Sequence, residues 1–188
     1  MRKVLGATPL FAALAGGYYL VVRGSLVADV RVGRRKVDLE EFETTIAAPR
    51  ETVFEVIASP YLLRTPHAMA DKLKVLERGS DMVLAEHYTP ATFGIVTTTL
   101  ETVRFERPER LHFRLLRGPV PHGEEIFELF DEGGRTRFHY SGWLEADLGP
   151  AGAAWARAVA RHWNRKVRDS VAAVKEEAER RASRPARS

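Results

Sequence analysis

The stretch FETTIAAPRETVFEVIASP, residues 42–60, places a strand directly before a helix. Phe42, Thr44 and Ile46 alternate with more polar side chains, which is the period of a strand with one buried face. Pro49 can then occupy the first position of a helix, where its missing N–H group costs no hydrogen bond. The stretch therefore predicts a strand that passes at once into a helix.

The predicted helix carries Val53, Phe54 and Ile57 at helical spacing. We expect it to run over residues 49–58 and to end at Pro60, because the residue before a proline disfavours helical geometry. The segment YLLRTP that comes next favours one more short helical turn.

From about Leu73 onward the pattern changes to a period of two, which is typical of strands. Turn signals rich in glycine and proline separate the segments. Successive strands joined by short turns favour an antiparallel sheet. The strand segments are LKVLER (73–78), MVLAEHY (82–88), FGIVTTTLETVRFER (93–107), LHFRLL (111–116), EEIFELF (124–130) and TRFHYSGWLEA (136–146).

A last helix is predicted over residues 151–182, after Gly149-Pro150. Its length of roughly 30 residues is far above the mean helix of about 11–12 residues. Its apolar residues form one stripe, and charged residues lie opposite. The stripe consists of Ala156, Val159, Ala160, Trp163, Val167, Val171, Val174 and Ala178.

The net charge of +4 is the sum of three unlike parts. Residues 1–37 carry +6, residues 38–156 carry −8 and residues 157–188 carry +6. A nucleic-acid-binding domain has its positive charge on the folded surface that meets phosphate. Because the body of this chain is acidic, we expect no nucleic-acid partner, and a membrane or another acidic surface near the ends fits better.

Residues 4–22, VLGATPLFAALAGGYYLVV, contain no charged residue. As a helix they would span about 28 Å, close to the bilayer's hydrocarbon thickness of about 30 Å. We expect an uncleaved membrane anchor; a signal peptide cleaved near Ala13-Leu14-Ala15 and a helix packed on the domain are the alternatives. Basic residues after the span outnumber those before it, which favours a cytoplasmic domain, whereas signal cleavage would lead to secretion.

The chain of 188 residues suits one domain with appendages, and it has no cysteine, which excludes disulfides and cysteine nucleophiles. Its six histidines lack the spacing of a metal site, and no HExxH, GxSxG, P-loop or GxGxxG motif occurs. We therefore expect no metal and no cofactor, and no constellation for nucleophilic catalysis is visible.

The element order resembles the helix-grip fold of the START-like (SRPBCC) superfamily, which includes polyketide cyclase/dehydrase-like and lipid-transport proteins. The resemblance rests on TTIAAPRETVFEVIASPYLL (44–63), RPERLHFRL (107–115), GGRTRFHYSG (133–142) and the last helix. It implies an α+β fold in which a curved antiparallel sheet of about six to seven strands grips the long carboxy-terminal helix. Two short helices after the first strand plug the open end, and an apolar helix precedes the domain.

Three parts are expected from the resemblance and the chain ends. They are a membrane anchor with a basic juxtamembrane linker over 1–37, a START-like ligand-binding domain over 38–182 and a polar tail over 183–188. Proteins of this fold keep an apolar cavity between sheet and long helix, which implies a lipid, polyketide or quinone-like ligand. The cavity residues that we expect are Phe54, Ile57, Tyr61, Tyr88, Phe113, Phe127, Tyr140, Val159, Trp163, Val167, Ser170 and Val174.

Three polar residues are weak candidates for acid–base catalysis: His122, Glu125 and Tyr140. His122 in RGPVPHG is either a solvated loop residue or, if that loop rims the cavity, a general acid or base beside Glu125. Tyr140 shares a strand face with Phe138, so its hydroxyl needs a partner if it is buried.

Other polar residues leave two possibilities open. His87 and Tyr88 are neighbours on one strand, so one of them points inward. Ser170 either bonds back to the carbonyl one turn earlier or donates to a ligand. Arg64 and His67 are either solvated or part of the cavity rim.

Three functions of different kinds fit these observations. We expect a membrane-tethered binding or carrier protein for an apolar small molecule, an interpretation that leans away from an enzyme. A polyketide cyclase/dehydratase-type enzyme is the alternative, and a partner-binding module of the co-chaperone kind is a further one. Ligand, reaction and oligomeric state are left open by the sequence.

Overall fold

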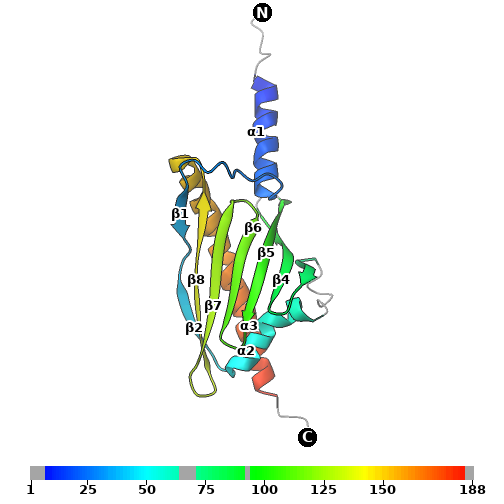
Figure 1. Ribbon diagram of the computed structural model, residues 1–188, viewed down its shortest axis with the longest axis vertical. Coiled ribbons are helices and arrows are strands. Elements are labelled where there is room, and N and C mark those ends of the chain that lie inside the picture. The colour runs from blue at the N-terminus through cyan, green and yellow to red at the C-terminus, as the bar shows by residue number, and fades with distance from the viewer. Residues whose placement is uncertain (1–6, 64–70, 92–93, 185–188) are drawn as a thin grey trace, which may run out of the picture.

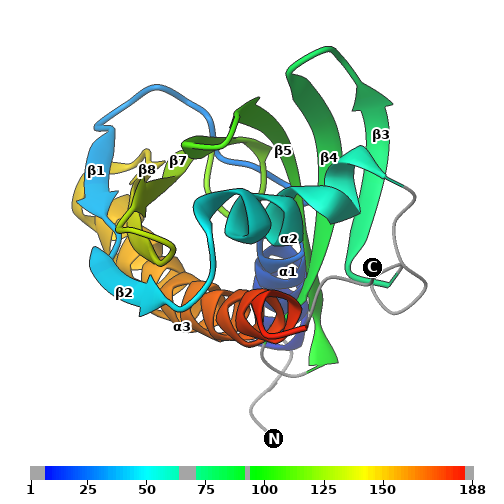
Figure 2. The same cartoon turned by 90° about the horizontal axis from the view of Figure 1, so that it is seen from below.

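The computed structural model describes residues 7–63, 71–91 and 94–184. One curved antiparallel sheet wraps around the long helix α3 (Gly149–Ala182), as Figure 1 shows. The short helix α2 (Arg50–Leu62) lies across one end of the space between them (Figure 2). The predicted α+β helix-grip architecture is confirmed.

The sheet has eight strands, more than we predicted, and its order is β1-β8-β7-β6-β5-β4-β3, with β2 also paired to β8. The additional strand arises because β1 and β2 both pair with β8, one after the other along its length. The strands are β1 (Arg35–Asp38), β2 (Phe42–Ile46), β3 (Leu73–Arg78), β4 (Met82–Pro90), β5 (Val96–Glu106), β6 (Arg110–Arg117), β7 (His122–Asp131) and β8 (Thr136–Ala146).

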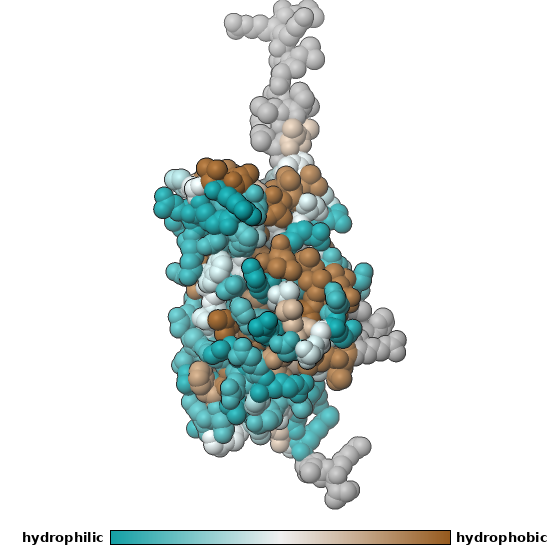
Figure 3. Space-filling view, viewed as in Figure 1, coloured by the Kyte–Doolittle hydropathy of each residue, from teal (hydrophilic) through white to brown (hydrophobic). Residues whose placement is uncertain are grey.

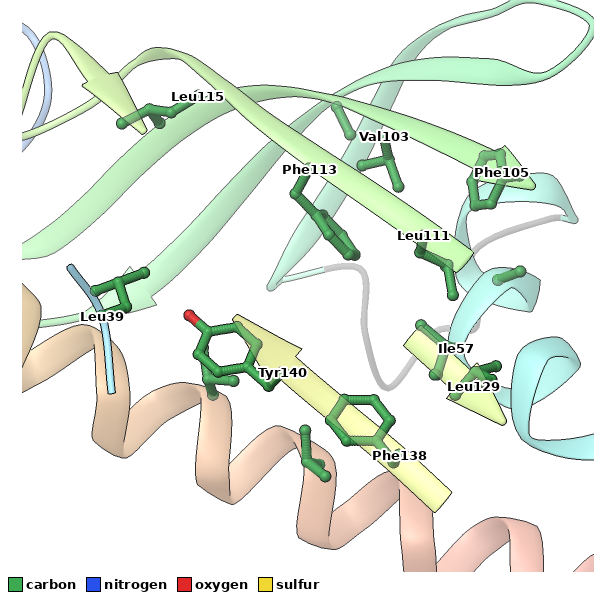
Figure 4. Close-up of a cluster of buried hydrophobic side chains, with 14 of the residues drawn as sticks. Leu39, Ile57, Val103, Phe105, Leu111, Phe113, Leu115, Leu129, Phe138 and Tyr140 are labelled. Carbon is green, nitrogen blue, oxygen red and sulfur yellow. The ribbon is translucent and has the colours of Figure 1, made fainter. Parts of the chain in front are cut away.

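The core lies between the inner face of the sheet and the apolar stripe of α3. Alternation along each strand turns one set of side chains inward, as the period of two predicts. Figure 4 shows Leu111 and Phe113 of β6 and Phe138 and Tyr140 of β8 in this interior. Burial of such side chains supplies the main stabilisation of the fold.

Helix α2 differs from the prediction at both ends. Pro49 precedes the helix instead of opening it, and the helix continues past Pro60 to Leu62. A proline so close to the end of a helix removes a single N–H donor, and the Ser59 hydroxyl donates to the Val56 carbonyl at 3.4 Å instead. The predicted further helical turn begins as part of α2, and its remainder lies outside the described residues.

Helix α3 begins two residues before its predicted start. Leu148 precedes it in a left-handed conformation, with φ at 73°. Val167 and Val171 of the stripe are buried, whereas Trp163 and Val174 are half-buried against the core. The stripe therefore faces the sheet as its spacing predicts.

The chain ahead of the sheet forms helix α1 (Ala7–Val22), which projects from the end of the domain opposite α2 (Figure 1). In the described part of the chain, no helix is both long and apolar enough to cross a bilayer. Of the predicted membrane segment 4–22, residues 4–6 lie outside the described residues. The last residues of the predicted linker, 35–37, belong to strand β1.

Candidate active site

The interior between sheet and α3 contains polar side chains among the apolar ones. On β5 the inward positions run from Val103 to Glu101, and on β7 they run from Phe127 to Glu125. The two glutamates are only 5% and 7% exposed. Charged residues are almost never this buried unless they are paired, so their partners decide what they can do.

Glu125 is held by donors from β8 and α3. The Tyr140 hydroxyl donates a hydrogen bond of 2.8 Å to Glu125 Oε2, and Trp163 on α3 donates to the same carboxyl group. Gly142 lies opposite Glu125 on β8. A Cβ at Gly142 would meet the Glu124 carbonyl oxygen at 2.6 Å, so glycine allows the close strand approach at this point.

Burial raises the pKa of Glu125 from its ordinary value of 4.5 to about 7, and the negative charge of Glu101 adds to the rise. The hydrogen bonds from Trp163 and Tyr140 act in the opposite direction, because they favour the charged carboxylate. Burial and the charge of Glu125 raise the pKa of Tyr140. Near neutral pH, Glu125 therefore gains and loses a proton while Tyr140 stays a donor.

A second polar group connects α2 to β4 and β5. The Tyr61 hydroxyl lies 2.9 Å from His87 Nε2, and His87 Nδ1 lies 3.2 Å from Glu101 Oε2. The Thr99 hydroxyl donates a bond of 2.6 Å to Glu101 Oε1. Burial and the charges of Glu101 and Glu125 raise the pKa of Tyr61, so this hydroxyl too stays protonated.

Aromatic rings connect the two polar groups. The rings of Phe113 and Phe127 are 4.8 Å apart, centre to centre. Phe127 lies 5.7 Å from Tyr140 in the first group, and Phe113 lies 6.2 Å from Tyr61 in the second. Both groups therefore line one aromatic interior, where a low dielectric strengthens their electrostatic effects.

The space beside these groups is narrow. The space bounded by Glu101, Phe113, Glu125 and Trp163 totals about 170 Å³ and is too narrow throughout to admit a water molecule. Beside Glu101 and Glu125 the structure therefore shows a narrow space lined by aromatic side chains, and the binding of a ligand between sheet and α3 stays a prediction. A hollow of about 270 Å³ lies on the outer face of the sheet beside Trp143, away from the buried acid–base groups.

Two predicted site residues point to the outer face of the sheet. His122 lies 3.8 Å from Asp29. It cannot stand beside Glu125, because positions three apart on a strand point to opposite faces. Tyr88 also points outward, and its hydroxyl donates to Glu86 at 2.7 Å.

The structure also decides the two alternatives that the sequence left open for His87 and Ser170. His87 takes the inward position next to Tyr88, so one of the two neighbours faces the interior, as predicted. Ser170, which we placed in the cavity, is exposed and donates back to the Lys166 carbonyl at 2.9 Å. A local bond to the preceding turn was the open alternative, and it is the one that forms.

The remaining predicted cavity residues face or flank the core. Arg64 and His67 lie outside the described residues. Ligand contact by the core residues stays a prediction. Buried among them are Phe54, Ile57, Phe113, Tyr140 and Val167, and half-buried against the core are Tyr61, Phe127, Val159, Trp163 and Val174.

Of the second polar group, the sequence analysis named Tyr61 and His87 but missed Glu101 and Thr99. Val103 and Phe105 are inward on β5, and counting back by two reaches Glu101 and Thr99. The threonines on both sides of Leu100 hide the alternation of inward and outward residues along β5. The register between β5 and β6 also shifts at Leu100. A strict count from the aromatic end of the strand would have found Glu101.

Metal binding has no support among the described residues, where no three His, Asp or Glu side chains form a group that could hold an ion. The two polar groups instead combine carboxylates, an imidazole and two phenols. Such groups carry out general acid–base chemistry, most effectively when a pKa lies near the working pH. A buried carboxyl with a pKa of about 7 meets that condition.

Comparison with known proteins identifies related sequences and folds. The profile of a family described as polyketide cyclase / dehydrase and lipid transport matches residues 40–179. No curated protein matches the chain. The sequence resemblance to the START-like superfamily is confirmed by the family match and by the structural neighbours.

Several solved structures share the fold. The Zhui aromatase/cyclase from Streptomyces sp. R1128 is 23% identical, with a TM-score of 0.63 over 79% of this chain and 95% of that one. The di-domain ARO/CYC StfQ from the steffimycin biosynthetic pathway is 16% identical, with a TM-score of 0.60 over 79% of this chain and 53% of that one. A START superfamily protein from Mycobacterium smegmatis is 13% identical, with a TM-score of 0.51 over 78% of this chain and 97% of that one. Identities this low show the fold alone.

Proposed function

The chain belongs to the polyketide cyclase/dehydrase and lipid transport family, and from this premise we propose that it is a cyclase/dehydratase-type enzyme. Its substrate is an apolar small molecule that carries carbonyl and hydroxyl oxygens and binds between the sheet and α3. The observation that carries the proposal is the Tyr140–Glu125 pair, a buried carboxyl whose pKa is about 7.

The proposed reaction begins with proton transfer from carbon. The ionised Glu125 carboxylate takes a proton from a carbon next to a substrate carbonyl, and the C–H electron pair forms the carbon–carbon double bond of an enolate. The Tyr140 hydroxyl, kept protonated by its raised pKa, supplies a hydrogen bond to developing negative charge. Glu125, now protonated, gives this proton to a hydroxyl group on the next carbon; the enolate re-forms the carbonyl, its electron pair makes a double bond between the two carbons, and the C–O bond breaks so that the hydroxyl leaves as water.

The second polar group supplies another acid–base site in the same interior. Glu101 lies beside His87, and His87 contacts Tyr61. An imidazole next to a carboxylate can accept a proton and hold it as an ion pair. We assign to this group the binding and protonation of a second substrate oxygen, while Glu125 acts at the carbon.

The energetic cost of the buried groups argues for chemistry over transport alone. A carrier of apolar molecules needs an apolar interior, and taking a charge out of water costs several kcal/mol per ion even after relaxation. Two carboxylates in one interior also repel each other. A site that must gain and release protons explains why Glu101 and Glu125 are nevertheless there.

The enzyme and the carrier share a binding step, and only the enzyme then transfers a proton. Incubation with 2-tetralone in deuterium oxide tests the difference, because removal of a proton next to its carbonyl exchanges that hydrogen for deuterium. Nuclear magnetic resonance measures the exchange. We expect the protein to accelerate exchange, Glu125→Gln to abolish the acceleration, and Glu124→Gln, which changes the neighbouring outward residue, to retain it.

Three outcomes of this assay have different meanings. Acceleration that survives in Glu125→Gln would remove Glu125 from the mechanism. Binding of the apolar dye 1-anilinonaphthalene-8-sulfonate without any exchange would favour a carrier, the function first expected from the sequence. If the protein neither binds the dye nor accelerates the exchange, both functions are contradicted.

We further propose that the protein is attached to a membrane through residues 4–22, with the domain in the cytoplasm. The uncharged sequence of this segment and the basic residues after it support the proposal. Full-length protein should sediment with membranes and resist protease added outside intact cells. Digestion of the domain would contradict the orientation, and recovery in the soluble fraction would contradict the attachment.

A further inference from the structure

The end of the domain from which α1 projects carries six exposed apolar side chains. Val32 is 65% exposed and Leu148 is 56% exposed. Figure 3 shows hydrophobic residues at this end on both sides of the base of α1. Exposed apolar groups clustered at one place mark a surface that meets a partner or a membrane. The six residues, which we call the apolar rim, are Leu26, Val30, Val32, Val96, Leu116 and Leu148.

The backbone is in an unfavourable conformation at the rim residue Leu148 and at Arg31, which lies between the rim residues Val30 and Val32. Among the described residues, Arg31 and Leu148 alone have positive φ values without being glycine, at 58° and 73°. The Leu148 N–H donates to the Val32 carbonyl at 2.7 Å, which joins the two strained segments. Asparagine or glycine suits a solvated left-handed position better than leucine, so an exposed leucine there indicates a role for its side chain.

A buried carboxylate fixes this arrangement. Asp147 accepts a hydrogen bond of 2.6 Å from the Arg31 N–H and one of 2.8 Å from Arg34 Nε. Arg34 also pairs with Asp29, the one acidic residue between positions 23 and 37. The segment that carries Val32 is therefore attached rigidly to the start of α3.

Helix α1 continues from the rim in a defined direction. The Thr98 N–H donates to the Arg23 carbonyl at 3.0 Å, and the ring of Tyr18 lies 6.1 Å from Trp155 of α3. Seen along the long axis, α1 lies between α3 and β5 (Figure 2). Most of its described side chains from residue 12 to residue 20 are exposed, and none is charged. Water is an unfavourable surrounding for such a helix.

Charge selects the partner. Residues 23–36 carry five Lys or Arg against one acid, and Arg23, Arg31 and Arg35 are exposed. The rest of the domain, residues 38–182, carries a net charge of −4. An anionic surface therefore attracts the rim and repels the body, which restricts the orientation of the domain.

We propose that the apolar rim docks on the surface of an anionic lipid bilayer, with α1 directed into the lipid. The inference deepens the proposed membrane attachment, because it makes the folded domain itself a lipid-binding surface. Attachment through residues 4–22 alone would not require the rim itself to touch lipid. Docking of the rim holds α3 and the sheet at one fixed orientation to the membrane.

Single-cysteine labelling tests this contact, and the absence of native cysteine makes the labelling specific. Val32→Cys and Leu148→Cys report the rim in the full-length protein, each labelled with a nitrobenzoxadiazole dye that brightens and shifts to the blue in lipid. Leu76→Cys and Phe130→Cys are matched controls, since both residues are exposed and apolar but lie away from the rim. Circular dichroism checks that each labelled variant is folded.

Vesicles of phosphatidylcholine with phosphatidylglycerol are compared with vesicles of phosphatidylcholine alone. We expect binding to the anionic vesicles, with bright, blue-shifted dye at positions 32 and 148 and unchanged dye at 76 and 130. Binding with no difference between rim and control positions would overturn rim docking and leave attachment through 4–22 intact. Equal rim signals on both vesicle types would overturn the choice of an anionic surface, and no binding to either would overturn docking and attachment together.

Discussion

The two ends of the space between sheet and α3 differ in chemistry although the same strands build them. Next to α2, the inward residues of β7 and β8 are apolar, as Leu129 and Phe138 show. One or two positions farther along, the same faces present Glu125, Tyr140 and Glu101. Figure 4 shows the change along β8, from the Phe138 ring to the Tyr140 hydroxyl.

This difference separates residues that hold the fold together from residues kept for chemistry. Hydrophobic burial contributes about 25 cal/mol for each Å² removed from water, so the apolar end stabilises the domain directly. Buried ion pairs and carboxyls are often no better for stability than apolar groups of similar shape. Substitutions at the apolar end should therefore lower stability strongly, whereas substitutions of the buried polar groups should affect stability less and the acid–base chemistry more.

The largest effect on the free energy of unfolding is expected at the apolar end. Phe138→Ala should lower the free energy of unfolding by about 3–5 kcal/mol, because a fully buried ring is lost and a cavity remains. Urea unfolding measures the change. Leu76→Ala, at an exposed position, is the control and should cost about 1 kcal/mol or less. A similar small cost for Phe138→Ala would contradict its place in the core.

The next effect is a dependence of stability on pH. The folded protein keeps a proton on Glu125 up to about pH 7, whereas the unfolded chain releases it near 4.5. Stability should therefore be highest below pH 4.5 for this group and fall by up to about 3 kcal/mol as the pH rises to 7. Glutamine at 125 cannot ionise, so the stability of wild type relative to Glu125→Gln should decline across that range. If stability changed with pH equally in wild type and Glu125→Gln, the raised pKa of Glu125 would be refuted.

Much of the fold can be predicted from periodicity, whereas the site depends on pairings that periodicity does not contain. The strand period and the long stripe through Trp163 predict the sheet and α3, since both patterns are local. The bond from Tyr140 to Glu125 needs the register of β7 on β8. The contact of Tyr61 with His87 needs α2 to be placed over β4. Counting every second residue along a strand finds the inward residues, but it does not show which residue of another element each one contacts.

A smaller effect is expected when one partner of the polar pair is removed. Tyr140→Phe leaves Glu125 with one donor fewer and should cost about 1–3 kcal/mol. It should also raise the pKa of Glu125 further, because the hydroxyl favours the charged form. The double variant Tyr140→Phe/Glu125→Leu removes both polar groups and should be more stable than the single one. A double variant less stable than Tyr140→Phe would mean that the pair holds the fold.

The smallest effect on stability is expected at Trp163, on the border between the two ends. Its indole is half-buried and lies beside the narrow space next to Glu125. Trp163→Ala should therefore cost about 1–2 kcal/mol, less than a fully buried ring, since fewer contacts are lost. Binding of 1-anilinonaphthalene-8-sulfonate should change strongly in the same variant. A loss as large as that of Phe138→Ala, in a protein that never binds the dye, would make this region part of a filled core.

The most direct test of the account is the titration of Glu125 itself. Protein labelled with ¹³C at glutamate carboxyl carbons gives a signal for each residue, and Glu125→Gln identifies the one that belongs to position 125. Tracking that signal through the pH range measures the pKa without a substrate. We predict a midpoint near 7, as burial beside Glu101 requires. A midpoint near the ordinary 4.5 would contradict the claim that this interior is an acid–base site.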